Sequence, residues 1–394
     1  MRRKIKLGIF GFGCVGQGLY GVLQQTLGIN AEIKKICIKH PYKKRPIESS
    51  YFTTDAGVLL NDPEIDVIVE LIDDVEAAFE IVTSALRKGK AVVSANKKMI
   101  AENFMYLYEL QQEMQASFLY EASSCASIPI IRNLEEYYDN DLLNSVEGIF
   151  NGSTNYILTS LFENNMDFGT ALRDAQLKGF AETDPSLDVD GYDSKYKLCI
   201  ILAHAFGLFL KPEDIFNYGI RNINTFDIQY AREKNLKIKL LAKCRKTDGK
   251  VYAYVMPGFV PGDAPIAQVE NEYNGIIVEG AFSEHQFFTG KGAGGNPTGS
   301  AVLSDISALT YNYRYEYKKK LQGFNNEYTK DIVLDVYVRF PSGHQIDNGL
   351  FEEIAVKYES PGYNYLLGKI NLGKLWESGL TENEKVSIIL NATS

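Results

Sequence analysis

The sequence predicts an α/β protein in which a mostly parallel sheet is followed by a mixed α+β domain and a small C-terminal α/β module. Short apolar runs alternate with helical segments over residues 5–94, and the first run ends in a glycine-rich turn. Strands that are joined through helices pair in parallel and are covered on both faces. After about residue 125 long helical segments and alternating strands replace this pattern. This change favours a second domain of mixed structure.

The individual elements follow from hydrophobic periodicity and from helix stop signals. In the first domain we predict strands at 5–10, 33–38, 66–72 and 91–94, and helices at 17–26 and 76–88. In the second we predict helices at 130–138, 156–162, 168–178 and 193–206, and strands at 145–150, 250–260 and 275–280. The remaining stretch has predicted strands at 331–339 and 385–390 and is long enough for a small regulatory or packing module.

Composition and charge exclude several classes of protein. The chain has 394 residues, of which 45% are hydrophobic and 23% charged, as in ordinary globular proteins of two or three domains. The net charge of -9 argues against nucleic acid as a main partner. Five cysteines without a C-x-x-C pair and four scattered histidines indicate neither a disulfide framework nor a zinc site.

No segment of the sequence has the pattern of a membrane anchor or a leader. The longest apolar run, residues 198–210, contains a histidine and is too short to span a bilayer. The basic N-terminus continues directly into the first predicted strand and has no cleavage-site pattern. We therefore expect a reduced, cytoplasmic protein with no membrane partner.

A glycine-rich turn follows the first predicted strand. Gly11-x-Gly13-x-x-Gly16 opens a helix, which is the context that a dinucleotide-binding Rossmann fold requires. Gly13 would let the backbone approach a pyrophosphate, and the free N–H groups of the helix start would stabilise its charge. We predict cofactor contacts at Gly11, Gly13, Val15 and Gly16. The alternative is a glycine-rich turn with no ligand.

The end of the second predicted strand bears on the choice of cofactor. An NAD enzyme usually has an acidic residue there, which binds the ribose 2′-hydroxyl. This chain instead has Lys39-His-Pro-Tyr-Lys-Lys-Arg45. These cations would attract a 2′-phosphate, so we predict NADP, with Lys39 as a contact and NAD as the other candidate. The alternative is a solvated basic loop.

A dense group of charged residues lies between 179 and 197. Five carboxylates and two lysines occur there in Gly-Phe-Ala-Glu-Thr-Asp-Pro-Ser-Leu-Asp-Val-Asp-Gly-Tyr-Asp-Ser-Lys-Tyr-Lys. Asp193 and Lys197 are four residues apart and would share one face of a helix that begins near Gly191. They could handle a proton together. An ordinary i, i+4 salt bridge is the alternative.

With these motifs in view, the chain resembles homoserine dehydrogenase. The matching segments are Asn96-Lys97, Gly-Ile-Phe-Asn-Gly-Ser-Thr-Asn-Tyr-Ile-Leu at 148–158, the segment 179–197, and Gly-x-Gly-Ala-Gly-x-x-Pro-Thr-x-Ser-Ala-Val at 290–302. They stand in the family's order and cover roughly residues 5–325.

The resemblance implies reversible, NAD(P)H-dependent reduction of L-aspartate 4-semialdehyde to L-homoserine. Hydride transfer then accompanies proton transfer to an oxygen, and a buried lysine suits the second task. Carried over by position, Lys197 would be the general acid/base, Asp193 would hold it, Glu182 would bind the substrate ammonium, and Lys97 would lie between cofactor and substrate. The resemblance also implies that Thr154 and Gly179 line the substrate cleft, and that Gly292 and Gly294 form a loop near the nicotinamide.

Three segments depart from the family pattern. Asp73-Asp74 replace a Gly-Gly pair, and could weaken or contact the cofactor or simply cap the next helix. In relatives the loop that corresponds to 121–128 can bind a monovalent cation such as sodium, which here would involve Glu121, Ser124, Ala126 and Ile128. Ala126 reaches positive φ at a higher cost than glycine, which weakens the case for the cation. Many relatives end in a threonine-sensing ACT-type domain, but its effector loop is not recognisable here.

The resemblance implies a domain plan and an assembly. We expect a dinucleotide-binding domain formed by 1–127 with 305–325, a catalytic and dimerisation domain at 128–304, and a C-terminal module at 326–394 that could be ACT-like. The first strand starts too early for a preceding kinase domain, which indicates a monofunctional enzyme of threonine and methionine biosynthesis. A homodimer or homotetramer is expected.

Two other functions remain as alternatives. An acylating semialdehyde dehydrogenase would need a nucleophilic cysteine with a base, and Cys125 is the one cysteine in a suitable loop. A regulatory protein that senses NADP without turnover would explain the substitutions at 73–74 and 125–127. Retention of Lys97, Glu182, Asp193 and Lys197 argues against the sensor.

Overall fold

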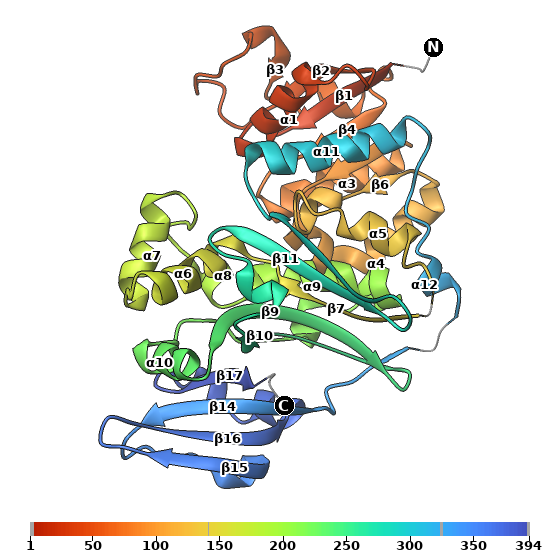
Figure 1. Cartoon of the computed structure of the whole chain (residues 1–394). Coiled ribbons are helices and arrows are strands. Elements are labelled where there is room, and N and C mark those ends of the chain that lie inside the picture. The colour runs from red at the N-terminus through yellow and green to blue at the C-terminus, as the bar shows by residue number, and fades with distance from the viewer. Residues whose placement is uncertain (1–3, 141, 324–325, 392–394) are drawn as a thin grey trace. The chain divides into compact units, whose positions relative to one another are not determined.

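The structure is a computed structural model that describes residues 4–140, 142–323 and 326–391. The chain forms two compact units (Figure 1). The first gathers Met1–Asp139, Cys199–Lys211 and Lys291–Gln322, and the second Asn140–Leu198, Pro212–Gly290 and Gly323–Ser394. The expected boundary at residue 325 lies outside the described residues.

The first unit contains a parallel sheet with strand order β3-β2-β1-β4-β5-β6. This is the order of a dinucleotide-binding fold, in which the ligand lies beyond the carboxyl ends of the strands. The strands are β1 (Ile5–Phe10), β2 (Ala31–Cys37), β3 (Phe52–Thr53), β4 (Val67–Glu70), β5 (Ala91–Ser94) and β6 (Phe118–Leu119). The central strands are almost wholly apolar and buried, as a sheet covered on both faces requires.

Helices connect and cover these strands. They are α1 (Cys14–Gln25), α2 (Gly57–Leu60), α3 (Val75–Arg87), α4 (Lys97–Met114), α5 (Ile130–Glu136), α11 (Gly295–Leu309) and α12 (Lys318–Leu321), with 3-10 turns η1 (Ser49–Tyr51) and η2 (Glu121–Ser123). The helix predicted at 17–26 begins three residues earlier, at Cys14, because Gly13 already serves as its N-cap. Strand 91–94 has the predicted bounds.

α11 packs directly on α1 although it is far away in the sequence (Figure 1). A Cβ atom on Gly18 would lie 2.0 Å from the carbonyl oxygen of Gly295, and one on Gly299 would lie 2.5 Å from the backbone nitrogen of Leu19. Real Cβ atoms do not approach backbone atoms so closely, so only glycine fits at these positions. The returning segment thus completes the cofactor-type fold.

The second unit is built on one mixed sheet. Its path is β12-β11-β7-β9-β10-β17-β14-β16-β15, and β8 and β13 pair with β10. The strands are β7 (Leu143–Ile149), β8 (Phe216–Asn217), β9 (Leu236–Thr247), β10 (Lys250–Pro261), β11 (Tyr273–Gly280), β12 (Glu284–Lys291), β13 (Glu327–Tyr328), β14 (Val333–Pro341), β15 (Phe351–Glu359), β16 (Tyr363–Asn371) and β17 (Ser387–Asn391).

The helices of the second unit lie between these strands in the sequence. They are α6 (Gly152–Glu163), α7 (Phe168–Leu177), α8 (Ser186–Val189), α9 (Tyr192–Phe206), α10 (Thr225–Glu233) and α13 (Leu372–Glu377), with 3-10 turns η3 (Pro212–Asp214), η4 (Pro265–Gln268), η5 (Asn348–Leu350) and η6 (Leu380–Glu382). The two units divide α9 between them after Leu198.

The C-terminal strands continue the sheet of the second unit. β17 pairs in parallel with β10 at Gly258 and Phe259, and it pairs antiparallel with β14. A shared core joins side chains of β10, such as Met256, to Val336 and Ile388 of the tail. The connection between β14 and β15 holds only the short turn η5 where a β-α-β-β-α-β module would have a helix.

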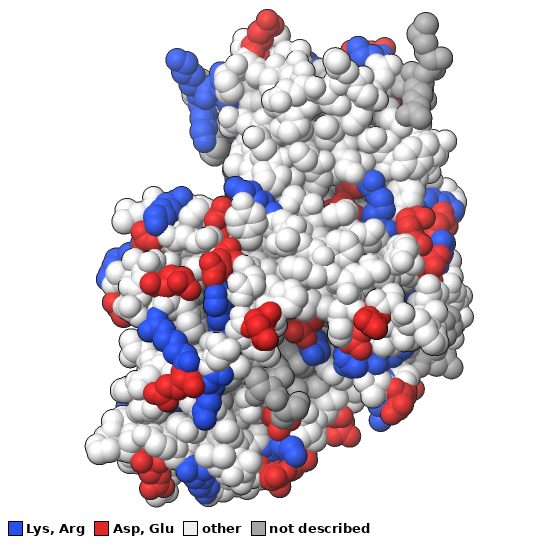
Figure 2. Space-filling model, in the orientation of Figure 1, with Lys and Arg blue, Asp and Glu red and all other residues white. Residues whose placement is uncertain are grey.

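Among the described residues, no helix is both long enough and apolar enough to cross a lipid bilayer. On the face seen in Figure 2, acidic and basic side chains are interspersed and do not gather in one basic patch.

Candidate functional site

The glycine-rich turn between β1 and α1 has the shape of a phosphate cradle. Gly11 has φ +96°, and a Cβ there would lie 2.6 Å from the carbonyl oxygen of Leu71. A Cβ on Gly16 would lie equally close to the carbonyl oxygen of Gly11. Exposed Gly13 caps α1 without a side chain, and the first turn of the helix, with Val15, has no acidic residue. The N–H groups of this helix start therefore suit an anion.

The basic loop after β2 divides into two kinds of cation. The guanidinium of Arg45 donates hydrogen bonds to the carbonyl oxygens of His40 (2.8 Å) and Lys43 (2.7 Å) and lies over the ring of Phe52. Arg45 therefore shapes the loop itself. Lys39 is exposed, and so are the other lysines of the loop. Lys39 is thus available to a phosphate at the end of β2.

A buried carboxyl group holds the ends of β4 and β5 together. Glu70 accepts hydrogen bonds from the hydroxyl of Ser94 (2.5 Å) and from the backbone N–H of Ile72 (2.7 Å). Burial raises the pKa of Glu70 to about 7. Ser94 Oγ in turn accepts from the backbone N–H of Asn96, which caps α4 by accepting from Met99. This network fixes the turn at which α4 starts.

Lys97 is the first residue of α4 and is half-buried.

The Asp73-Asp74 pair, which departs from the family pattern, has a structural reason at its second residue. The side chain of Asp74 accepts a hydrogen bond from the backbone N–H of Ala77 (3.1 Å) and caps α3. This confirms the capping interpretation for Asp74.

The carboxylate of Glu121, in the candidate cation loop, already accepts hydrogen bonds from the backbone. The two oxygens of Glu121 accept from the N–H groups of Ile131 and Arg132, each at 2.8 Å. Burial raises the pKa of Glu121 to about 7. In the described chain no group of three or more His, Cys, Asp or Glu side chains could hold a metal ion. A cation at this loop would therefore take mainly backbone oxygens, with the buried hydroxyl of Ser124 as a further oxygen ligand.

The backbone of the same loop adopts the required turn without glycine. Ala126 has φ +43°, so alanine does take the left-handed conformation that was expected to be costly. The carbonyl oxygen of Glu121 accepts from the N–H of Ser124 (3.3 Å), and that of Ile128 accepts from the N–H of Ile130 (2.9 Å). A carbonyl oxygen has two lone pairs, so both retain one for a second partner.

The predicted pair on α9 is present and buried. Lys197 Nζ lies 2.7 Å from Asp193 Oδ2, and it also donates to the carbonyl oxygen of Phe150 at 2.6 Å. The two residues are 5% and 6% exposed. An ordinary surface pair at this spacing contributes little, whereas a buried pair cannot lose one partner without leaving an uncompensated charge. The burial favours a functional interpretation over the ordinary salt bridge.

Sequence reasoning missed a residue that contacts this pair. Asn151 Nδ2 donates to Asp193 Oδ2 at 2.9 Å and to Asp188 Oδ1 at 2.6 Å. Its Oδ1 accepts from the N–H of Thr154 at 2.8 Å and so caps α6. An Asn between a predicted strand and a predicted helix was the available signal, because a residue that caps a helix with its amide oxygen keeps its two amide N–H groups for other acceptors.

The remaining expected substrate residues differ in their surroundings. Thr154 is fully buried, and its hydroxyl donates to the carbonyl oxygen of Asn151 (3.0 Å). Gly179 is exposed with φ +76° just beyond α7. The side chain of Glu182 is exposed, and its carbonyl oxygen accepts from Gln176 Nε2 at 2.9 Å. Of these, Glu182 offers a carboxylate to solvent.

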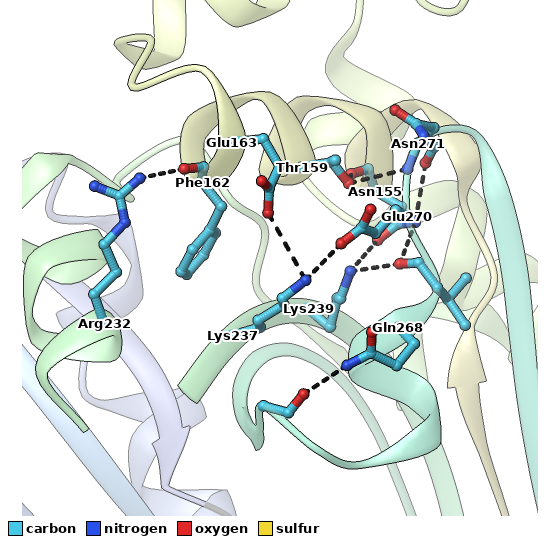
Figure 3. A network of polar contacts seen from close by, with 12 residues as sticks. Asn155, Thr159, Phe162, Glu163, Arg232, Lys237, Lys239, Gln268, Glu270 and Asn271 are labelled. Atoms are coloured by element: carbon cyan, nitrogen blue, oxygen red, sulfur yellow. Dashed lines mark hydrogen bonds and ion pairs between the residues drawn. The ribbon is translucent and has the colours of Figure 1, made fainter. Parts of the chain in front are cut away.

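A second polar network ties α6 to the segment before β11 (Figure 3). Asn155 Nδ2 is shared among the carbonyl oxygens of Val269, Asn271 and Tyr273, at 2.9–3.1 Å. Lys239, only 2% exposed, donates to Asn155 Oδ1 (3.1 Å) and to the carbonyl oxygen of Val269 (2.5 Å). Burial lowers the pKa of Lys239 to about 8. The motif at 148–158 therefore has two roles: Asn151 contacts Asp193, and Asn155 holds α6 to the segment before β11.

The second glycine-rich segment opens α11. Gly294 has φ +111° and is the N-cap of that helix, and Gly292 before it is buried. As at Gly13, the cap provides no side-chain hydrogen bond. Cys125, the nucleophile of the alternative dehydrogenase, is fully buried, which does not suit attack on a substrate.

The motifs and both folds have counterparts in known proteins. A family model described as "Homoserine dehydrogenase" matches residues 129–307, and one described as "Homoserine dehydrogenase, NAD binding domain" matches 11–121. A homoserine dehydrogenase of Helicobacter pylori is 36% identical over 316 residues, which cover 78% of this chain and 74% of that protein. The chain belongs to the homoserine dehydrogenase family. It is an NAD(P)-dependent oxidoreductase that acts on a CH–OH group.

Other homoserine dehydrogenases extend the similarity over the C-terminal part. One from Bacillus subtilis is 31% identical over 382 residues, covering 92% of this chain and 87% of that protein. The crystal structure of a homoserine dehydrogenase from Thiobacillus denitrificans has a TM-score of 0.88 at 27% identity and covers 99% of this chain and 98% of that one. A hyperthermophilic archaeal homoserine dehydrogenase mutant in complex with NADPH has a TM-score of 0.67 at 26% identity, covering 80% of this chain and all of that one.

Proposed function

We propose that this homoserine dehydrogenase interconverts L-aspartate 4-semialdehyde and L-homoserine with Lys197 as the general acid/base. The observation that carries the proposal is the buried contact of Lys197 with Asp193, at 2.7 Å. In oxidation, neutral Lys197 accepts the hydroxyl proton of homoserine as the carbinol carbon loses its hydride. In reduction the same ammonium returns the proton to the aldehyde oxygen. A positioned proton acceptor of this kind contributes roughly 10²–10⁴ to the rate.

The second unit also supplies the groups that hold the substrate. Asp193 and the carbonyl oxygen of Phe150 fix Lys197 Nζ from two directions. The exposed carboxylate of Glu182 binds the ammonium of the amino acid, because a fixed anion is the natural partner of that group. Thr154, which is buried, acts through the start of α6, and Gly179 gives the segment before Glu182 its turn.

The first unit binds the nicotinamide cofactor, and we propose a preference for NADP over NAD. When bound, that cofactor supplies and accepts the hydride. The turn at Gly11, Gly13, Val15 and Gly16 receives the pyrophosphate at the start of α1. Exposed Lys39 attracts the 2′-phosphate, and no Asp or Glu stands between it and the end of β2.

Three further residues complete the proposed cofactor side. Lys97 at the start of α4 contacts cofactor and substrate, which suits its place at the carboxyl end of β5. Gly292 and Gly294 at the start of α11 border the nicotinamide. Both helix starts offer N–H groups and no competing carboxylate in their first turns.

The loop at 121–128 is the proposed place of a monovalent cation such as sodium. The left-handed φ of Ala126 supports it, because the loop adopts without glycine the turn on which backbone ligands depend. The ligands would come from Glu121, Ser124, Ala126 and Ile128, mainly through their backbone oxygens. The test is the initial rate in sodium against choline at equal ionic strength.

Assembly, location and domain plan are proposed from the family resemblance. We propose a homodimer or homotetramer in the cytoplasm, acting in threonine and methionine biosynthesis. The functional domains are 1–127 with 305–325, 128–304 and 326–394, the last being a small C-terminal module.

The catalytic role is tested with two lysine variants. Lys197→Met should lower kcat/KM for homoserine oxidation by roughly 10²–10⁴, the contribution of a positioned proton acceptor, while the enzyme still binds NADPH, measured by fluorescence titration. Lys178→Met is the matched control, because Lys178 pairs with Asp174 at the same i, i+4 spacing on α7 but is exposed. Near-normal turnover by Lys197→Met would remove Lys197 from the reaction.

A further inference from the structure

The side chain of Asn151 has only one possible orientation. The backbone N–H of Thr154 points at one terminal atom of its amide, at 2.8 Å, and an N–H requires an acceptor. That atom is therefore the oxygen, and the NH₂ group must point the other way. Asn151 itself is only 5% exposed. The helix start of α6 thus orients two N–H donors toward the carboxylates of Asp188 and Asp193.

Each of these donors has a carboxylate as its acceptor. One N–H meets Asp188 Oδ1 at 2.6 Å, and the other meets Asp193 Oδ2 at 2.9 Å. Asp193 Oδ2 is also the atom that Lys197 Nζ contacts at 2.7 Å. A single amide therefore joins the end of β7, the short helix α8 and the first turn of α9.

The Asn151 amide offsets the repulsion between the carboxylates of Asp188 and Asp193. Asp188 and Asp193 both lie within hydrogen-bond distance of one nitrogen, and two anions so close to each other repel, the more so because Asp193 is buried. The charged groups within hydrogen-bond distance of the amide are these two carboxylates, and the ammonium of Lys197 contacts the same oxygen of Asp193 as the amide does. The amide N–H groups stabilise both anions without adding a charge, and hydrogen bonds to charged groups are the stronger kind.

We propose that Asn151 is a positioning residue for proton transfer, whose amide holds Asp193 in contact with Lys197 and couples that pair to Asp188 in the substrate segment. The proposal rests on the proposed role of Lys197. Asn151 also couples Asp188 to Asp193. A substrate that displaces the segment around Asp188 changes the hydrogen bonding of Asp193 through the Asn151 side chain.

Two substitutions separate this role from helix capping. Asn151→Ser keeps an N-cap oxygen and removes both amide donors, and Asn151→Asp keeps the cap and the shape but adds a third carboxylate. We expect Asn151→Ser to lower kcat/KM for homoserine at least tenfold. We expect Asn151→Asp to move the acid limb of the pH profile of homoserine oxidation upward by at least roughly 0.5 pH unit, because an added anion favours protonated Lys197.

The chain offers a matched control for the capping role. Asn371 caps α13 by accepting from the N–H of Gly373 (2.9 Å), and its Nδ2 donates to Asp331 at 2.9 Å. Asn371→Ser therefore removes the same kind of contacts away from Lys197 and should leave both kcat/KM and the pH profile unchanged. NADPH affinity should be unaltered in all three variants, since Asn151 belongs to the other unit.

A double-mutant cycle with Lys197→Met separates failure of this proposal from failure of the proposed function. If Asn151 acts through Lys197, the two substitutions are non-additive in kcat/KM. A folded Asn151→Ser or Asn151→Asp enzyme with wild-type kcat/KM and pH profile overturns the positioning role. An active Lys197→Met enzyme overturns the proposed function instead, and additive effects show that Asn151 acts on something other than Lys197.

Discussion

The buried ammonium of Lys239 makes a quantitative prediction about stability and pH. Replacing Lys239 by methionine keeps the length of the side chain and removes the charge that now lies between Asn155 and Val269. Burial lowers the pKa of Lys239 from 10.5 to about 8. At about 1.4 kcal/mol for each unit of pKa, the folded state disfavours the charged form by ~3.4 kcal/mol.

The sign of the effect follows from the protons bound in each state. Below pH 8 folded and unfolded chains both carry the proton, so the full cost of the buried charge is present. Between pH 8 and 10.5 the folded chain has lost the proton and the unfolded chain has not, so stability rises with pH. From pH 7 to pH 9.5 the unfolding free energy of the wild type, relative to Lys239→Met, should therefore rise by about 2 kcal/mol.

The assay is urea unfolding of both proteins at several pH values in that range. Lys243→Met is the control from the same strand, because Glu147 keeps the pKa of Lys243 above its ordinary value in spite of burial. The difference in unfolding free energy between Lys243→Met and the wild type should stay constant up to pH 9.5, since Lys243 is protonated in both the folded and the unfolded chain. If the difference in unfolding free energy between the wild type and Lys239→Met does not change with pH over the same range, Lys239 does not have a lowered pKa in the folded protein.

Three other substitutions test single features of the first unit. Asp74→Ala removes the cap of α3 and should cost about 1 kcal/mol in urea unfolding without changing KM for NADP, whereas a large rise in KM would assign Asp74 to the cofactor. Lys39→Glu should lower kcat/KM for NADP by at least roughly tenfold and leave that for NAD nearly unchanged, and equal loss with both would discard the 2′-phosphate contact. Gly299→Val places a side chain against the backbone of Leu19 and should cost roughly 3 kcal/mol, whereas Gly21→Ala, which meets open space, should not destabilise α1.

The elements that sequence patterns predicted well are those whose signals are local. Strand β1 and its turn follow from an apolar run and three glycines, and β5 from four residues between a helix stop and Asn96. Asp193 and Lys197 were paired from helical spacing alone, and the structure confirms that contact. In each case the deciding residues lie within a few positions of one another.

The elements that were missed depend on distant partners. Strand β9 was not predicted, because its three lysines Lys237, Lys239 and Lys243 hide the apolar pattern of a buried strand. These lysines lie on one face of β9, and their acceptors are far away in the sequence. α11 begins with glycines that are unfavourable for a helix, and these are retained because α1 approaches its backbone. The bridge from Asn151 to Asp188 and Asp193 spans 37 and 42 residues, so no local pattern reveals it.

The most direct test of the account is the initial rate of nicotinamide reduction by the wild-type protein with L-homoserine. We predict an absorbance increase that requires homoserine, is faster with NADP than with NAD, and is lost in Lys197→Met while Lys178→Met retains it. A wild-type protein that reduces neither cofactor with homoserine, or a Lys197→Met protein that reduces NADP at the wild-type rate, would contradict it.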